Sequence, residues 1–173
     1  MERNEAYREA EQKIEAARRS GAKELDLSVR RGGYKTPKLT ALPESLGQFT
    51  QLQSLNLTNN QLTTLPEWLG QLTHLQSLNL SDNRLPSLPA SIAELQKLRN
   101  LWLGSQSGGN PLRELPLVVR SLQSLKRLWA LSCHIATIPE WLDELTELSV
   151  LNLFYNSIAE VPEQVGRLTR AIA

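Results

Sequence analysis

One leucine pattern recurs at a fixed spacing along this chain, and it constrains the fold more than any other feature. Leucine accounts for 34 of the 173 residues. The pattern is a 23-residue unit, LxxLxLxxNxLxxLPxxLxxLxx, and its clearest copies are 52–74 and 75–97. A repeat of this length indicates a stack of similar units that share one continuous core.

Six units of this kind cover residues 22–170. Two of them are longer than 23 residues, by seven in the first unit and by four in the fourth, and both insertions follow the LxL segment. Residues 1–21 precede the repeats, and residues 171–173 begin an incomplete seventh. The predicted units are 22–51, 52–74, 75–97, 98–124, 125–147 and 148–170.

Each unit divides into an extended segment and a short helical turn. Leucines two apart in LxL, such as Leu55 and Leu57, point to the same side of an extended chain. The LPxxLxxL portion spaces its apolar residues as a helical turn does. Proline is tolerated at the start of such a turn because the first N–H groups have no helical partner.

This pattern resembles the leucine-rich-repeat family, in particular its 23-residue "LP" type. The resemblance implies an α/β repeat fold. The fold would be a short curved solenoid with a parallel sheet on the concave side and short helical turns on the convex side. The family is mostly used for protein–protein recognition, so the resemblance also implies a non-catalytic binding module.

The segment 14–28, IEAARRSGAKELDLS, is similar to the entry sequence of bacterial intracellular leucine-rich-repeat proteins. These include proteins whose repeats precede a Roco-type GTPase. The chain has no GxxxxGK[ST] phosphate loop, so no nucleotide function carries over from that resemblance.

The residues before the first repeat are expected to form a capping helix. Ala6, Tyr7, Ala10, Ile14 and Ala17 make an apolar stripe at helical spacing, and Gly21 suits the position just after the helix. Terminal repeats need a polar outer cover, which this helix would supply.

Asparagine at the ninth position of the unit predicts a ladder of buried side chains, from successive repeats, that runs through the stack. Asn60, Asn83, Asn110 and Asn156 occupy this position, and a buried amide needs hydrogen-bond partners in the turn backbone. Cys133 takes the position in the fifth unit. We therefore expect Cys133 to be buried and inert.

Composition argues against several other classes of function. The formal net charge is +1, which provides no overall field for binding nucleic acid or a membrane. One cysteine and two histidines make no metal cluster, and no acid–base pair or phosphate loop emerges. The first 20 residues lack the apolar stretch of a secretory signal. We expect a cytoplasmic protein that is not an enzyme and needs no cofactor.

The outward positions of the sheet give the sharpest functional signal. They are small and polar in the first units, whereas the later units gather aromatic and basic residues that are typical of protein interfaces. We predict a partner-binding patch for a protein or peptide with acidic groups. Its residues are Trp102, Trp129, Leu131, Phe154, Tyr155, Arg99, Lys126 and Arg127.

The same residues leave other interpretations open. Trp102 and Trp129 can stack on each other across neighbouring strands without any partner. The insertions around 29–38 and 104–111 can contribute contacts or be tolerated loops, the second of them flexible. Tryptophan faces also stack on sugar rings, so carbohydrate binding is an alternative.

A further alternative is a self-associating structural unit, or a fragment of a larger signalling protein. The last apolar layer has no polar capping unit after it in this sequence, so a homodimer could form through that end. The layer consists of Leu153, Ile158, Val161, Val165 and Leu168.

Overall fold

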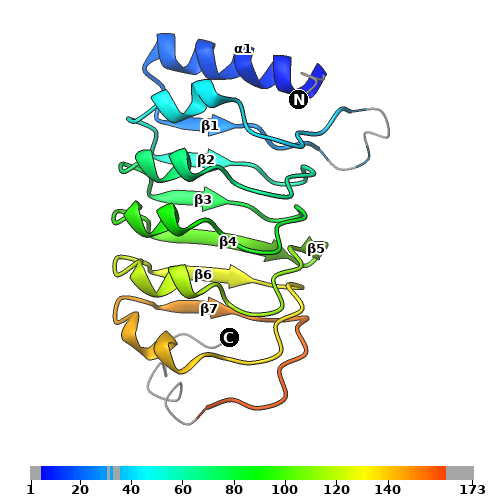
Figure 1. Ribbon diagram of the computed structural model, residues 1–173, viewed down its shortest axis with the longest axis vertical. Helices are drawn as coiled ribbons and strands as arrows, with labels where there is room; N and C mark the ends of the chain where they lie inside the picture. The colour runs from blue at the N-terminus through cyan, green and yellow to red at the C-terminus, as the bar shows by residue number, and fades with distance from the viewer. Residues whose placement is uncertain (1–4, 31, 33–35, 163–173) are drawn as a thin grey trace.

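The computed structural model describes residues 5–30, 32 and 36–162, and these form one stack of repeats (Figure 1). Helix α1, Glu5–Ser20, lies across the N-terminal end of the stack. The strands follow it in chain order along the long axis, each next to the strand of the neighbouring repeat.

The strands form one parallel sheet, in the order β1-β2-β3-β4-β6-β7, and β5 is an added strand that pairs antiparallel with β4. Equivalent leucines pair in register from strand to strand, as Leu55 does with Leu78. The strands are β1 Glu24–Asp26, β2 Ser54–Asn56, β3 Ser77–Asn79, β4 Asn100–Ser105, β5 Gly108–Gly109, β6 Arg127–Ala130 and β7 Val150–Asn152.

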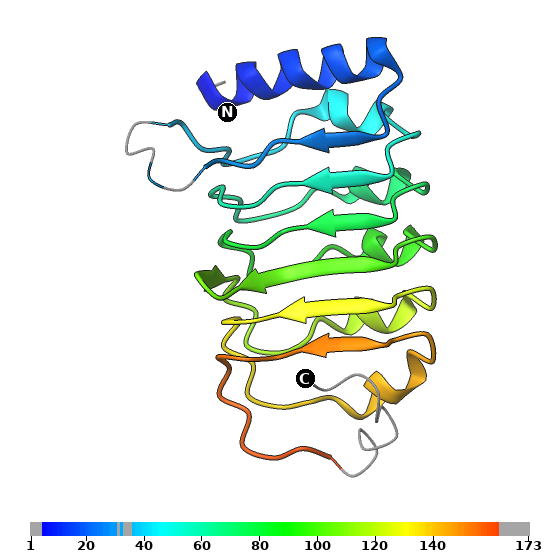
Figure 2. The same ribbon diagram turned by 180° about the vertical axis from the view of Figure 1, so that it is seen from behind.

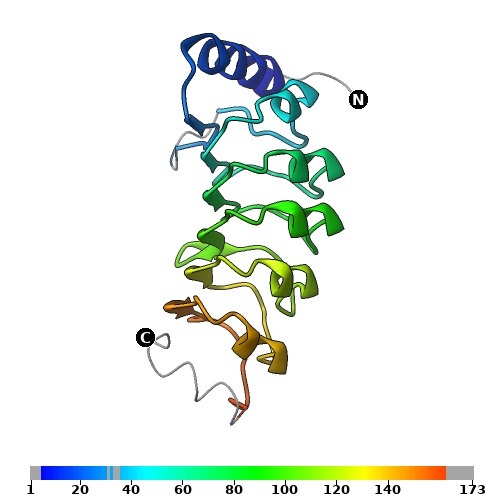
Figure 3. The same ribbon diagram turned by 90° about the vertical axis from the view of Figure 1, so that its left-hand side faces the viewer.

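In the described part of the chain, five short helices lie on the side opposite the strands (Figure 3). Each is a 3₁₀ helix of five residues that follows a proline, and its first bond spans three residues, as from Leu69 N to Pro66 O at 3.0 Å. The 3₁₀ form suits such short pieces. The helices are η1 Glu44–Gln48, η2 Glu67–Gln71, η3 Ala90–Glu94, η4 Leu117–Ser121 and η5 Glu140–Glu144.

The predicted fold class is therefore confirmed, with a parallel sheet and helical turns on opposite sides of a short curved solenoid. The inward leucines of the LxL segments form the core between them, and Leu57, Leu78 and Leu80 are fully buried. Burial of an aliphatic side chain contributes about 1.5–3 kcal/mol, so the repeated leucines supply most of the drive to stack.

Helix α1 covers the first repeat, as the apolar stripe predicts. Ala6, Ala10 and Ile14 are buried, and Tyr7 and Ala17 pack half-buried against the same core. Gly21 follows the helix with a φ of 66°, a left-handed conformation that glycine adopts without strain. At the other end of the chain, Val165 and Leu168 of the predicted terminal layer lie outside the described residues.

The asparagine ladder lies beneath the turns that leave the strands. Asn83 is 6% exposed, and its amide nitrogen donates to the carbonyl oxygens of Leu57 and Leu80 at 2.9 and 3.0 Å. Its Oδ1 accepts from Leu62 N at 3.1 Å. Each ladder amide thus bonds its own turn and the preceding repeat, which joins neighbouring units through buried polar groups.

Cys133 interrupts the ladder. Its thiol is fully buried and lies 3.4 Å from Leu103 O and 3.3 Å from Leu131 O. A thiol has no counterpart of the amide oxygen, and Leu112 N, the equivalent donor, bonds instead to Asn110 O at 2.8 Å. Burial raises the pKa of the Cys133 thiol to about 11, which keeps it protonated near neutral pH.

Replacing Asn83 with alanine should destabilise the protein strongly. The change leaves the Leu62 N–H buried without a partner, at about 1–3 kcal/mol. It also removes the bonds to Leu57 O and Leu80 O at about 1 kcal/mol each, although these carbonyls keep bonds from Asn60 and Asn110. We expect a loss of about 3 kcal/mol in the free energy of unfolding, measured by urea titration. The exposed Thr63→Ala serves as the control, and equal midpoints for the two variants would contradict a ladder role for Asn83.

Native Cys133 should resist thiol reagents. Raising its pKa from 9.0 to about 11 lowers the thiolate fraction near pH 8 about hundredfold, and burial slows access further. We expect slow reaction with Ellman's reagent in buffer and complete reaction in urea. Between pH 9 and 11 the unfolded thiol ionises while the native one does not, so stability should fall there. In Cys133→Ala the free energy of unfolding should decrease less between pH 9 and 11 than in the wild-type protein.

Candidate functional site

The outward face of the sheet carries one continuous row of side chains, one from the middle position of the LxL segment of each repeat, which reads LxA in the fifth. Figure 2 looks onto this sheet side of the molecule. The row crosses all six parallel strands in register. Its residues are Asp26, Asn56, Asn79, Trp102, Trp129 and Asn152.

Four residues of the row have a local structural role that the sequence analysis did not identify. In each, the side-chain oxygen accepts a hydrogen bond from the backbone N–H two residues later, which turns the chain at the end of the strand. The pairs are Asp26 with Ser28 at 2.9 Å, Asn56 with Thr58 at 3.1 Å, Asn79 with Ser81 at 3.0 Å, and Asn152 with Phe154 at 3.1 Å.

Trp102 and Trp129 replace this turn-forming residue in the fourth and fifth repeats. Without the side-chain acceptor the strands continue further, so that β4 has six residues and β6 has four, against three in the others of the row. The two indole rings stack, with centroids 4.5 Å apart and planes 2° from parallel. The mutual stacking expected as one alternative is therefore present, and both side chains remain half-buried.

Three exposed basic residues lie beside the tryptophans, at the starts of the same two strands. Lys126 N and Arg127 N both donate to Arg99 O at 2.9 Å, which places the three residues on adjacent chain segments. The ion pairs given for the described residues involve Arg18, Arg19 and Arg120, and none of the three patch residues takes part in them. Their charge is thus left to face solvent or a partner.

Leu131 does not belong to this surface. It was expected to point outward, but it is only 6% exposed. The register shifts by one residue between Trp102 and Gly104, so that Gly104 pairs with Ala130, and the hairpin that follows lies against the backbone of Leu131. This local shift depends on the glycines of the inserted loop, which the repeat spacing alone does not reveal.

Phe154 and Tyr155 follow β7 and are the most exposed aromatic residues of the patch, at 57% and 69%. Their rings lie 6.4 Å apart. Tyr155 has a φ of 59°, in a region that Asn59 and Asp82 occupy in equivalent turns. Asparagine and aspartate adopt this conformation readily, whereas a bulky aromatic is uncommon there. Tyr155 thus combines an exposed side chain with a strained backbone conformation.

The second insertion forms a hairpin of β4 and β5, not the flexible loop expected from its composition. Ser105 Oγ donates to the carboxylate of Asp82 at 3.0 Å, which ties the hairpin to the preceding repeat. A Cβ at Gly104 or Gly109 would overlap the carbonyl oxygen of Leu131 or Ser132, so the hairpin also packs closely on the following repeat. Parts of the first insertion, residues 31 and 33–35, lie outside the described residues.

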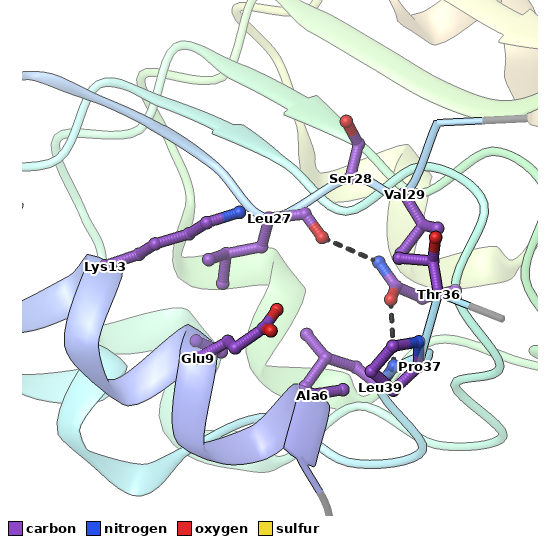
Figure 4. Close-up of a pocket in the computed structure, with 11 residues that line it drawn as sticks. Ala6, Glu9, Lys13, Leu27, Ser28, Val29, Thr36, Pro37 and Leu39 are labelled. Atoms are coloured by element: carbon purple, nitrogen blue, oxygen red, sulfur yellow. Dashed lines mark hydrogen bonds between the residues drawn. The ribbon is translucent and has the colours of Figure 1, made fainter. Parts of the chain in front are cut away.

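A small pocket lies at the other end of the stack, between α1 and the first repeat (Figure 4). Asn60 of the ladder closes it, donating to Leu27 O at 3.0 Å and accepting from Leu39 N at 2.9 Å. Its volume is about 60 Å³, far below the roughly 300–1,000 Å³ of ligand pockets. We therefore regard it as a packing gap under the capping helix.

Within the described ranges, His, Cys, Asp and Glu nowhere form a group of three or more that could hold a metal ion. No helix in the described part of the chain has both the length and the apolar character needed to cross a membrane. The aromatic and basic residues of β4, β6 and the turn after β7 are thus the feature that most resembles a functional site. We call Arg99, Trp102, Lys126, Arg127, Trp129, Phe154 and Tyr155 the concave patch.

Comparison with known proteins identifies the class of the molecule. A family model described as "Leucine-rich repeat region" matches residues 38–165, and the chain therefore belongs to the leucine-rich-repeat family. A leucine-rich-repeat protein of Leptospira interrogans is similar, with 38% identity and a TM-score of 0.73 over 79% of this chain. No curated protein matches the sequence significantly.

Two plant structures share the fold. The plant peptide hormone receptor RGFR1 in complex with RGF2 has 26% identity and a TM-score of 0.67, over 91% of this chain. PEPR1–AtPEP1 has 25% identity and a TM-score of 0.63, over 84% of this chain. The chain spans only 34% of the Leptospira protein, 25% of RGFR1 and 20% of the PEPR1 chain. All three share the repeat fold of this chain.

Gly109→Ala should show whether the hairpin is packed as described. The added Cβ would overlap the carbonyl oxygen of Ser132 and force the hairpin away from the next repeat, at about 1–3 kcal/mol of unfolding free energy. Urea unfolding measures the loss. The exposed Gln106→Ala, in the same loop, should leave stability unchanged, and a matching result for Gly109→Ala would argue for a loose hairpin.

Proposed function

We propose that the protein is a non-catalytic binding module whose concave patch holds an acidic segment of a protein or peptide partner. Trp102, Trp129, Phe154 and Tyr155 are the apolar anchors. Arg99, Lys126 and Arg127 select for carboxylates. The repeat stack contributes a rigid frame that presents these side chains on one face.

The observation that carries this proposal is the replacement of a turn-forming residue by tryptophan in two adjacent repeats. At the same register position the other four strands keep an aspartate or asparagine that bonds its own turn. Trp102 and Trp129 give up that bond and are not needed to fill the leucine core. Tryptophan, tyrosine and arginine dominate the energetics of protein interfaces, so a partner accounts for their presence on this face.

Charge and family support the chemistry of the partner. The patch cations take no part in the ion pairs given for the described residues, so a carboxylate would meet free guanidinium and ammonium groups. One structural neighbour is the plant peptide hormone receptor RGFR1 in complex with RGF2. A peptide or an extended protein segment is therefore the favoured class of ligand.

The double substitution Trp102→Ala with Trp129→Ala should abolish partner binding with little loss of melting temperature. Hot-spot tryptophans contribute about 2 kcal/mol or more each, so affinity should fall by well over a hundredfold. The partner would be captured from extracts with the wild-type protein, and its affinity measured by calorimetry. Asn56→Ala with Asn79→Ala is the matched control in the same row. Unchanged affinity in the tryptophan variant would refute the patch.

A further inference from the structure

We infer that the open side of the tryptophan stack, the slot between Trp129 and the side chain of Asn152, receives an aromatic side chain of an acidic peptide. The inference rests on the proposed function and adds to it where on the patch the partner is anchored and by what kind of residue. Three observations lead to the inference: the way the two indoles stack, the residues that surround the uncovered face of Trp129, and the charges beside that face.

The stack runs from strand to strand. Trp102 and Trp129 pair in register on adjacent strands, and their 4.5 Å centroid separation nearly equals the roughly 4.8 Å spacing of neighbouring strands. The planes are 2° from parallel, so the two rings lie face to face across the two strands. One face of each indole covers the other, and the second face looks toward the next strand in the row.

Both outer faces look over an asparagine. Asn79 is the register partner of Trp102, and Asn152 is the register partner of Trp129. Each asparagine is held down by the bond from its Oδ1 to the N–H two residues later. Because asparagine is much shorter than tryptophan, it does not cover the outer part of the indole face beside it, and both indoles are only half-buried. We call the space beside the uncovered part of each indole face a slot.

The two slots differ in the residues that flank their floors. Ser77 and Ser81 flank Asn79, and Ser81 is 2% exposed, so that side is polar and closed. Val150 and Phe154 flank Asn152, and Phe154 is 57% exposed. Val150 shares a face with Asn152 because the two are two apart on β7, and Phe154 follows in the turn that Asn152 forms. Two apolar residues therefore adjoin the Trp129 slot. A flat apolar side chain fits there and continues the aromatic stack.

Cations border the same slot. Arg127 pairs in register with Val150, and Lys126 O accepts from Val150 N at 3.1 Å, so both basic residues lie next to the apolar wall. A ligand with an aromatic ring in the slot would place its neighbouring groups beside these cations. An aspartate or glutamate next to the aromatic residue of the ligand could therefore form an ion pair with Lys126 or Arg127.

A peptide suits the slot better than a sugar does. A pyranose ring can stack on tryptophan, but its hydroxyl groups at the ring edge need hydrogen-bond partners when water is excluded. Val150 and Phe154 offer none from their side chains. The edge of a phenylalanine ring carries no polar group, so it can lie against Val150 and Phe154 without losing hydrogen bonds. Stacked aromatic pairs favour an offset geometry, which the spacing of neighbouring strands allows.

The test uses two fluorescein-labelled nonapeptides of glutamate and aspartate, one with a central phenylalanine and one with a central alanine. Fluorescence anisotropy measures their binding to the full chain. Wild-type protein should bind the phenylalanine peptide about tenfold more tightly, as expected for one aromatic stack plus its buried area. Equal affinity for the two peptides would overturn the slot.

Asn152→Trp fills the slot with a third indole and should remove the tenfold preference. Asn79→Trp is the matched control, since it loses the same kind of turn bond on the polar side, and it should keep the preference. An unchanged preference in Asn152→Trp, with wild-type melting temperature, would overturn the inference.

Failure of the proposed function gives a different result from failure of the slot. If the patch does not bind acidic segments, neither peptide binds the wild-type protein in a saturable way. If only the slot is wrong, both peptides bind equally, and Arg127→Glu weakens both. Displacement of the phenylalanine peptide by an acidic hexasaccharide at lower concentration than by unlabelled peptide would overturn the choice of a peptide.

Discussion

The in-register pairing of neighbouring repeats is the constraint on which the rest of this structure depends. No single unit buries its leucines alone, and each obtains a core only when the next unit lies against it. The parallel strands fix the register of that contact, as with Leu101 opposite Leu128. The buried asparagines fix it a second time, because each donates to carbonyl groups of two repeats at once.

Because of the same register, residues at one position of the repeat lie side by side in a row across the sheet. Every outward residue is repeated about 4.8 Å away on the next strand, so two substitutions at one position of the unit suffice to create a stacked pair. Trp102 and Trp129 arise in this way. The scaffold therefore sets the spacing of such a pair, and the backbone differs from the other repeats only where β4 and β6 extend and the register shifts.

The sequence predicts the repeated features of the fold well, because each has a physical reason that recurs. Leucine spacing identifies the strands and the core, and the prolines mark the start of the helical turns. The ninth-position asparagines are predicted with their hydrogen-bond role, which the distances confirm. The burial of Cys133 follows from its place in that series.

The irregular features could not be obtained in the same way. The inserted residues after Gly104 form a hairpin, and the register shift it causes buries Leu131, which repeat spacing alone places outside. The turn-forming role of Asn152 and its equivalents depends on a bond between residues two apart, and the unit pattern gives no sign of it. That role distinguishes four turn-forming positions of the row from the two that carry tryptophan. It indicates that the two tryptophans are the departure from the scaffold, because they alone in the row have given up the bond that completes it.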